Sequence, residues 1–380
     1  MRYPQIITSE FGPLDSYQEC PPFWLATPEQ GFPFLDQLGE ATRTVLGRSA
    51  GRREILAVEY GAKEAVDASS DNLASALAAT VGNADPTAIY PPAFFGAKRR
   101  RKPVVVLQGA IHGGEITGTV AALNLCRIIE AGTDLRGKAW PRLRELARDT
   151  RLLIIPWLNI DGACRWLLPH SIGAPAGLLD RCTFGVAGDG KPYQYLAMKN
   201  RFPIPPDQTQ FMGAYFNDAG VNLQYDFSQP ERQPETVAWM KYYLAERPDG
   251  VLVMHGNAGT LIGPPDAHLP EGYQHEVSRL GGAVRQRLLR DGLPAARMSW
   301  AGLPGLGKPG LNQCSAIYHV CGALPVLCEF PTGAAPAVMT AETMLDIGLI
   351  VLEEFLLYAH RDGLRPYEWR EKAMRTWEAK

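Results

Sequence analysis

Four short, almost purely apolar runs recur along the chain, and no other feature restricts its fold as strongly. They are residues 104–107 (VVVL), 152–158 (LLIIPWL), 251–254 (VLVM) and 324–328 (LPVLC). Runs of this length without polar alternation are typical of strands that helices bury on both faces. Helical patterns lie between or after them, at residues 115–131, 232–245, 271–290 and 340–360. This alternation predicts an α/β fold with a mixed, largely parallel central sheet flanked by helices on both faces.

The remaining segments carry weaker signals. Residues 1–50 are rich in proline and aromatic residues and predict an arm followed by a first helix at about residues 31–46. Residues 54–59 (EILAVE) alternate as a half-buried strand does, and residues 63–92 are Ala-rich and predicted to be largely helical. The long segment 163–220 is dotted with glycine and proline. It is either a functional lid or binding loop or a solvated insertion.

Composition excludes several classes of protein. The 380 residues include 38 Lys and Arg against 40 Asp and Glu, a formal charge of −2, which argues against a nucleic-acid partner. The basic run at residues 98–102 is therefore predicted to be a solvated loop. No stretch is apolar enough for a signal peptide or a membrane span, so no membrane partner is expected. The cysteines number seven, with no CxxC pair, which predicts reduced thiols and a cytoplasmic protein of unknown oligomeric state.

Polar side chains follow each of the four apolar runs. His112 and Glu115 follow the first, Asp161 follows the second, His255 comes directly after the third, and Glu329 comes directly after the fourth. The carboxyl ends of parallel strands meet at one edge of a sheet, where ligands bind. The convergence of four strand ends therefore predicts a functional site.

The residue types at these strand ends suit a catalytic zinc centre. Two histidines and one glutamate supply three ligands and leave the fourth position of the ion to water. His112 and Glu115 are spaced as a His-x-x-Glu pair, and His255 supplies a distant third ligand. Gly113 and Gly114 between the first two are expected to let the backbone turn sharply, so that both side chains face one ion.

The order of these motifs resembles the zinc carboxypeptidase A-type metallopeptidases, which are related to the succinylglutamate desuccinylase and aspartoacylase group. The resemblance rests on five short motifs, His112-x-x-Glu115, Asn159-x-Asp161-Gly162, Gly220-Val221-Asn222-Leu223, His255-Gly256 and Glu329. It extends over roughly residues 27–361, with residues 46–55 resembling the segment that opens the first strands of the family. It implies a catalytic domain at 27–361, an N-terminal arm at 1–26 and a C-terminal tail at 362–380.

The resemblance also implies roles for individual residues. One Zn²⁺ per chain would be bound by His112, Glu115 and His255. Glu329 matches the catalytic glutamate of the family, which acts as general base toward the attacking water and then as acid toward the leaving amine. Arg201 stands where the family places the arginine that stabilises the developing oxyanion.

The chain departs from the family where a substrate's terminal carboxylate would bind. Gln224 and Tyr225 replace the Asn-Arg pair of typical members, and a tyrosine hydroxyl cannot replace the bidentate, charge-assisted grip of an arginine. Asn222, which we group with these substrate-binding candidates, stands where an aspartate commonly orients a zinc-binding histidine. Arg165 and Lys308 are candidates for a relocated cation.

A second departure concerns the substrate-capping tyrosine of the family. The loop 302–312 contains no tyrosine, and Tyr318 lies closer to Glu329 than the family pattern predicts.

Three classes of function stay open. The first, which we favour, is a metallopeptidase that removes a C-terminal residue or cleaves another peptide-like amide. The second is a small-molecule N-acyl amino acid amidohydrolase resembling the desuccinylase and aspartoacylase group. The third is a non-catalytic zinc-binding module, against which the retention of Glu329 argues, because a pure binder needs no base.

Overall fold

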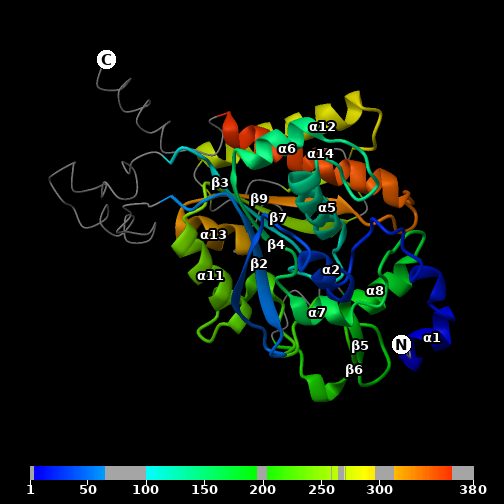
Figure 1. Cartoon of the computed structure of the whole chain (residues 1–380). Helices are drawn as coiled ribbons and strands as arrows, with labels where there is room; N and C mark the ends of the chain where they lie inside the picture. The colour runs from blue at the N-terminus through cyan, green and yellow to red at the C-terminus, as the bar shows by residue number, and fades with distance from the viewer. Residues whose placement is uncertain are drawn as a thin grey trace.

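A seven-stranded mixed sheet forms the centre of the molecule (Figure 1). The computed structural model describes residues 4–64, 100–194, 203–257, 259–263, 269, 271–295 and 312–361. Arg201, Lys308, the tail at 362–380, the loop 302–311 and nearly all of the predicted helix at 63–92 lie outside these residues.

The order of the strands places the four predicted apolar runs side by side. From one edge to the other the strands are β1 (Thr42–Arg48), β2 (Glu54–Tyr60), β4 (Arg151–Ile155), β3 (Val104–Gln108), β7 (Gly250–Asn257), β9 (Leu324–Pro331) and β8 (Leu261–Ile262). Strands β4, β3, β7 and β9 are parallel, whereas β1, β2 and β8 are antiparallel to their neighbours. The predicted fold class is confirmed.

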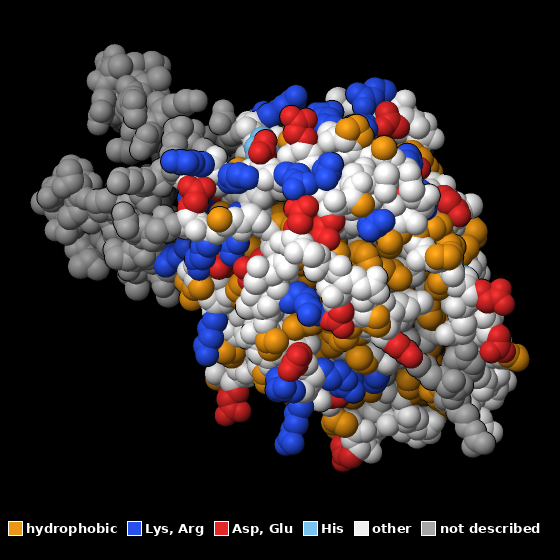
Figure 2. Space-filling view, viewed as in Figure 1, with side chains coloured by type: hydrophobic (Ala, Val, Ile, Leu, Met, Phe, Trp, Pro, Cys, Tyr) orange, Lys and Arg blue, Asp and Glu red, His pale blue; other side chains and the backbone are white. Residues whose placement is uncertain are grey.

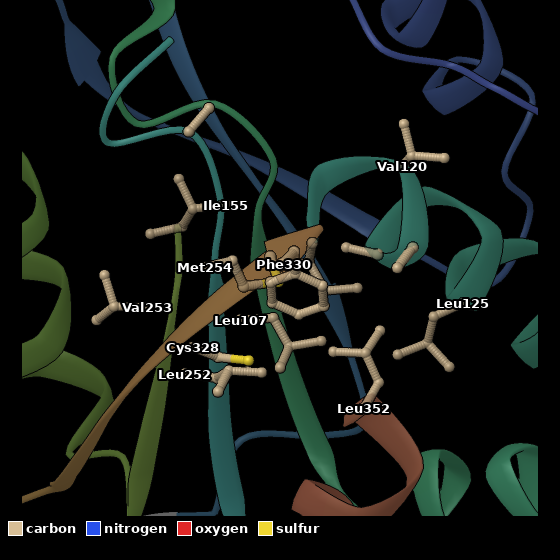
Figure 3. Close-up of a cluster of buried hydrophobic side chains, with 14 of the residues drawn as sticks. Leu107, Val120, Leu125, Ile155, Leu252, Val253, Met254, Cys328, Phe330 and Leu352 are labelled. Carbon is tan, nitrogen blue, oxygen red and sulfur yellow. The ribbon is translucent and has the colours of Figure 1, made fainter. Parts of the chain in front are cut away.

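One face of the sheet packs against the long helices α5 (Thr117–Ala131) and α14 (Ala341–His360). Figure 3 shows Leu107, Met254 and Phe330 of the strands lying toward Val120 of α5 and Leu352 of α14. Successive side chains of a strand point to opposite faces. His255 and Glu329, the neighbours in sequence of Met254 and Phe330, therefore point to the other face of the sheet.

Helices cover both faces of this sheet (Figure 1). Helix α14 also contacts α6 (Pro141–Arg148) and α12 (Glu271–Arg290), which complete the first layer. On the opposite face α13 (Gln313–Cys321) contacts β9 and α11 (Pro234–Glu246), and α11 contacts β1.

The shorter elements lie beyond the carboxyl ends of the parallel strands (Figure 1). The bounds of these elements are α1 (Gln5–Phe11), α2 (Pro28–Leu35), α7 (Ile160–Arg165), α8 (Ala176–Phe184), β5 (Gly185–Ala187), β6 (Thr209–Met212), α10 (Leu223–Asp226) and the 3₁₀ turns Asp15–Tyr17 and Pro206–Gln208. Helix α2 contacts α7, and α1 contacts α8. The segment 163–220 therefore contains a helix and a two-stranded sheet, β5 with β6.

The predicted helix at residues 31–46 is correct for residues 31–35 and wrong for the rest. Helix α2 spans Pro28–Leu35 and starts with a capping box between Thr27 and Gln30, whereas Thr42–Arg48 forms the edge strand β1. The β-branched residues Thr42, Thr44 and Val45 favour an extended backbone, and pairing with β2 supplies the backbone hydrogen bonds. No residue of this edge strand is buried, so it lacks the alternation of buried apolar and exposed polar residues by which a strand is usually predicted.

The N-terminal segment packs into the main hydrophobic cluster. Ile7, Leu14 and Trp24 are buried with the residues of the central sheet. The boundary at residues 26 and 27 stays a prediction.

The structure also bears on the predictions made for the basic run at residues 98–102 and for the cysteines. Arg100 of the basic run lies 3.0 Å from Asp249, and Lys102 Nζ donates to Arg148 O at 2.6 Å, so these two side chains are tied to the protein and not simply solvated. Cys314, Cys321 and Cys328 are buried in the core, and none of the three is part of a disulfide.

The surface gives two further observations. Positive and negative side chains are interspersed over the face shown in Figure 2. No helix within the described stretches is both long and apolar enough to cross a membrane.

Candidate metal centre

The turn after β3 carries the first two predicted ligands. Gly109 N donates to Ile155 O at 2.8 Å, and Ala110 adopts a positive φ of 48°, which is uncommon for a residue with a side chain. His112 and Glu115 follow, with His112 Nδ1 only 2.9 Å from Glu115 Oε1. Such strained backbone at a cluster of polar side chains is a frequent mark of a functional site.

Gly113 and Gly114 are required here because of close packing. Neither has a positive φ. A Cβ atom at Gly113 would clash with the backbone of Gly162 and Ala163, and one at Gly114 would lie 2.6 Å from the Trp166 ring. These glycines are therefore needed because α7 approaches closely, and not, as predicted, because the backbone turns sharply.

His255 joins the pair from the end of β7. His255 Nδ1 lies 2.9 Å from Glu115 Oε2, so the two oxygens of one carboxylate each face one imidazole. The ligand atoms of His112, Glu115 and His255 all lie within 4.8 Å of one another. Both histidines are almost fully buried, with exposed fractions of 3% and 4%.

The electrostatics of this cluster suit metal binding. Burial lowers the pKa of His112 and so favours the neutral imidazole that a metal requires. Burial alone would raise the pKa of Glu115, but the two neighbouring imidazoles outweigh it and hold that pKa well below its ordinary value. The cluster therefore presents a carboxylate between two imidazoles.

Asn222 lies against the nitrogen of His112 that does not face Glu115. Asn222 is the N-cap of α10, where its Oδ1 accepts from Gln224 N at 3.0 Å. The same oxygen lies 3.3 Å from His112 Nε2. In the tautomer that carries its proton on Nε2, this oxygen accepts that proton and Nδ1 keeps the lone pair that a metal needs. Asn222, grouped above with the substrate-binding candidates, thus contacts a predicted ligand.

The donor set fits zinc. Two imidazole nitrogens that each face one oxygen of the same carboxylate at 2.9 Å can share a cation, and this set leaves a tetrahedral ion one open position. No other group of three such side chains close enough to hold a metal occurs among the described residues.

Glu329 lies beside this cluster through the register of the sheet. It is the register partner of His255 in the parallel pair of β7 and β9. Register partners in a parallel pair point to the same face, and adjacent strands lie about 4.8 Å apart. Glu329 is half-buried, whereas His255 is buried. The sheet thus brings the predicted base next to a predicted ligand.

The motif Asn159-x-Asp161-Gly162 stabilises the backbone around the cluster and supplies no ligand. Asn159 Oδ1 caps α7 by accepting from Gly162 N at 2.9 Å. Asp161, fully buried, accepts from Ser49 Oγ at 2.6 Å, Gly51 N at 2.8 Å and Arg53 Nη1 at 2.7 Å. Asp161 therefore anchors the loop between β1 and β2 to α7.

The two residues that replace the Asn-Arg pair lie in α10. Gln224 is buried, and its Oε1 has no hydrogen-bond partner among the described residues. Tyr225 is half-buried. Arg165, a candidate for the relocated cation, is engaged elsewhere, by Asp218 and by the backbone carbonyls of Gly213, Phe216 and Asn217.

Tyr318 lies in α13, where its ring stacks edge-on against Tyr273 at 4.8 Å between centroids.

The sequence reasoning missed Tyr215. Its ring lies parallel to the His112 imidazole, with centroids 3.6 Å apart and planes 14° apart. No motif marks this tyrosine, because its contact partner lies about a hundred residues earlier in the chain.

Comparisons with known proteins agree with this geometry. Residues 34–167 match the model of the zinc carboxypeptidase family, a range that includes His112 and Glu115 but ends before His255 and Glu329. This family is zinc-dependent. The resemblance to zinc carboxypeptidases is thus confirmed for this range. No curated protein sequence matches the chain.

Solved structures extend the likeness to most of the chain. A metallo-carboxypeptidase from Burkholderia cenocepacia has 17% identity and a TM-score of 0.54, covering 88% of this chain and 70% of its own. A metallo-carboxypeptidase from Pseudomonas aeruginosa, solved with (2-guanidinoethylmercapto)succinic acid, has 13% identity and a TM-score of 0.52, covering 89% and 69%. At such identities the likeness establishes the fold alone.

Proposed function

We propose that this chain is a zinc-dependent hydrolase that cleaves a peptide or peptide-like amide bond, as a carboxypeptidase-type metallopeptidase with atypical recognition of the C-terminal end. The observation that supports it most directly is the carboxylate of Glu115, which lies 2.9 Å from Nδ1 of both His112 and His255. We further propose that residues 27–361 form the catalytic domain.

The proposed chemistry divides between the ion and the chain. Zinc held by His112, Glu115 and His255 would lower the pKa of a water toward ~7 and polarise the scissile carbonyl. Glu329, the register partner of His255, would accept the proton of the attacking water and deliver it to the leaving amine. Arg201 is proposed to bind the developing oxyanion.

The proposed specificity follows from α10. Gln224 and Tyr225 carry no positive charge, and Arg165 is held by Asp218. A buried guanidinium that is lost from a carboxylate site removes roughly 2–4 kcal/mol, about 30- to 1000-fold in kcat/KM. We therefore propose that a neutral or amidated C-terminal end is accepted nearly as well as a free carboxylate.

The test compares three substrates on zinc-loaded protein: a short peptide, its C-terminal amide and an N-acyl amino acid. We expect cleavage of both peptides at rates within about 10-fold of each other. A preference for the free acid above ~10³-fold would contradict the atypical recognition and indicate a relocated cation. Cleavage of the N-acyl amino acid alone would favour the small-molecule amidohydrolase.

Two variants sharpen this comparison. Tyr225→Arg should shift the preference toward the free acid by restoring a charged partner. Glu329→Gln serves as the control for contaminating peptidase, since hydrolysis that persists at the full rate in this variant does not come from the proposed site.

A further inference from the structure

The imidazole of His112 is restrained from several directions. Its Nδ1 faces Glu115, its Nε2 faces Asn222 Oδ1 at 3.3 Å, and the ring of His255 meets it edge-on at 4.9 Å. Tyr215 covers one of its faces, with ring centroids only 3.6 Å apart. Of these neighbours, only Tyr215 restrains the imidazole by lying flat against it.

The loop that carries Tyr215 is attached to the turn that carries His112. Gly113 N donates to Ala214 O at 2.8 Å, so the residues adjacent to the two stacked rings are hydrogen-bonded to each other. On its far side the loop is fixed to the end of α8, where Tyr215 N donates to Thr183 O at 2.9 Å. The position of Tyr215 relative to His112 is therefore set by the backbone.

A separate hydrophobic cluster supports the ring of Tyr215. Tyr193, Ile204, Tyr215 and Phe216 are buried together and apart from the main core. Phe184 and Phe216 meet the Tyr215 ring edge-on, at 5.1 Å and 5.6 Å between centroids. The exposed fraction of Tyr215 is 5%, so the stacked face is shielded from water.

We propose that Tyr215 is a positioning residue for the metal, which holds the plane of the His112 imidazole so that Nδ1 stays directed at the ion. This inference rests on the proposed function. A metal bound at Nδ1 places positive charge on the imidazole, and the face of an aromatic ring attracts positive charge. The stack therefore becomes more favourable when the metal binds, and it prevents the rotation that would withdraw Nδ1.

The experiment measures the zinc dissociation constant by competition with a chromophoric chelator. Tyr215→Leu removes the flat ring and should weaken zinc binding about 10-fold or more, as loss of a partner that orients a ligand does. Tyr215→Phe keeps the ring and should stay within about 2-fold of the parent protein. Tyr215→Met repeats the test if the leucine variant does not fold, because methionine also lacks a flat ring but has a longer and more flexible side chain than leucine.

Ile204→Val is the matched control. Ile204 is fully buried in the same cluster but has no ring that could lie against Tyr215 or His112. This variant should change zinc affinity less than about 2-fold, because it removes one methyl group from the cluster and leaves all its aromatic rings in place. The absorption spectrum of the Co²⁺-loaded protein should change in Tyr215→Leu and not in Ile204→Val.

The outcomes separate this inference from the proposed function. If the parent protein binds one zinc and Tyr215→Leu binds it equally well, or if Ile204→Val weakens binding as much, the role of Tyr215 is overturned and the proposed function stands. If the parent protein binds no zinc, both are overturned.

Discussion

At the scale of single residues, the tautomer of His112 decides whether the cluster can bind a metal. Asn222 Oδ1 accepts a hydrogen bond from Gln224 N and lies 3.3 Å from His112 Nε2, where it can accept only from the tautomer protonated at Nε2. An asparagine oxygen carries less negative charge than the aspartate that commonly occupies such a position, so it favours this tautomer while adding less basicity to the imidazole.

We expect one zinc per chain, bound by His112, Glu115 and His255. His255→Ala removes one of three protein ligands and should abolish most of the zinc affinity, whereas His319→Ala, an exposed histidine on α13, should leave it unchanged. Metal analysis of zinc-loaded, desalted protein measures this. Stoichiometric zinc in His255→Ala would contradict the ligand set.

Glu329→Gln should keep both the fold and the bound zinc and lower turnover by at least ~10²-fold. The amide is close in shape to the carboxylate but cannot accept the proton, and general base catalysis is typically worth about 10²–10⁴. The measurement is kcat on whichever substrate the parent protein cleaves, with zinc content determined on the same sample. Turnover near that of the parent protein would exclude Glu329 as the base.

At the scale of elements, a buried carboxylate joins pieces of chain that are distant in sequence. Asp161 of α7 accepts from Ser49 and Arg53 of the loop between β1 and β2, and from Asp218 N at 3.1 Å. Burial alone would raise the pKa of Asp161, but these hydrogen bonds outweigh it and lower that pKa. The carboxylate thus holds the first hairpin and the loop before α10 in place around the metal cluster.

Asp161→Asn should destabilise the protein by about 2–4 kcal/mol. In either orientation the amide would direct its NH₂ group at donors, Gly51 N and Asp218 N on one side or Ser49 and Arg53 on the other, and leave them unpaired, at about 1–3 kcal/mol each. The free energy of unfolding in urea measures this. Asp180→Asn, at an exposed position of α8, is the control and should change it by less than about 0.5 kcal/mol. Equal effects of the two variants would show that Asp161 is not a structural anchor.

At the scale of the whole molecule, the buried side chain of Glu235 should make the free energy of unfolding depend on pH. Glu235 is fully buried in α11, where its Oε1 accepts from Ala50 N at 3.0 Å and from Asn217 Nδ2 at 3.2 Å. Burial raises the pKa of Glu235 from 4.5 to about 7, and the nearby charge of Asp161 contributes to the rise. The folded state therefore binds this proton more tightly than the unfolded chain does.

The sign of the effect follows from this difference. Between pH 4.5 and about 7 the folded state holds more protons at Glu235 than the unfolded state, so its contribution to stability falls as the pH rises. The total change is about 3 kcal/mol at 1.36 kcal/mol per pKa unit. Glu235→Gln should remove this part of the slope of unfolding free energy against pH.

Glu246→Gln provides the matched comparison. Burial opposes the charge of Glu246 as well, but Arg151 and Lys63 outweigh it and lower its pKa, so its contribution is instead lost as the pH falls. Each variant should change the slope of unfolding free energy against pH relative to the parent protein, and the two changes should have opposite signs. An unchanged slope in Glu235→Gln would refute the predicted titration.

The sequence by itself determined the central architecture and the candidate ligands. The four apolar runs became the four parallel strands, because a run without polar alternation is stable only between two layers of helices. His112, Glu115, His255 and Glu329 converge because parallel strands end at one edge of a sheet. Local pattern and strand direction were sufficient for both.

Only the tertiary structure decided what surrounds these residues. Nothing in the sequence indicates that Arg165 is engaged by Asp218, that Gly113 and Gly114 leave room for α7, or that Tyr215 lies flat on His112. Each of these contacts joins segments separated by about fifty residues or more. Such contacts depend on how loops of the segment 163–220 pack against the turn after β3, and hydrophobic periodicity contains no information on that packing.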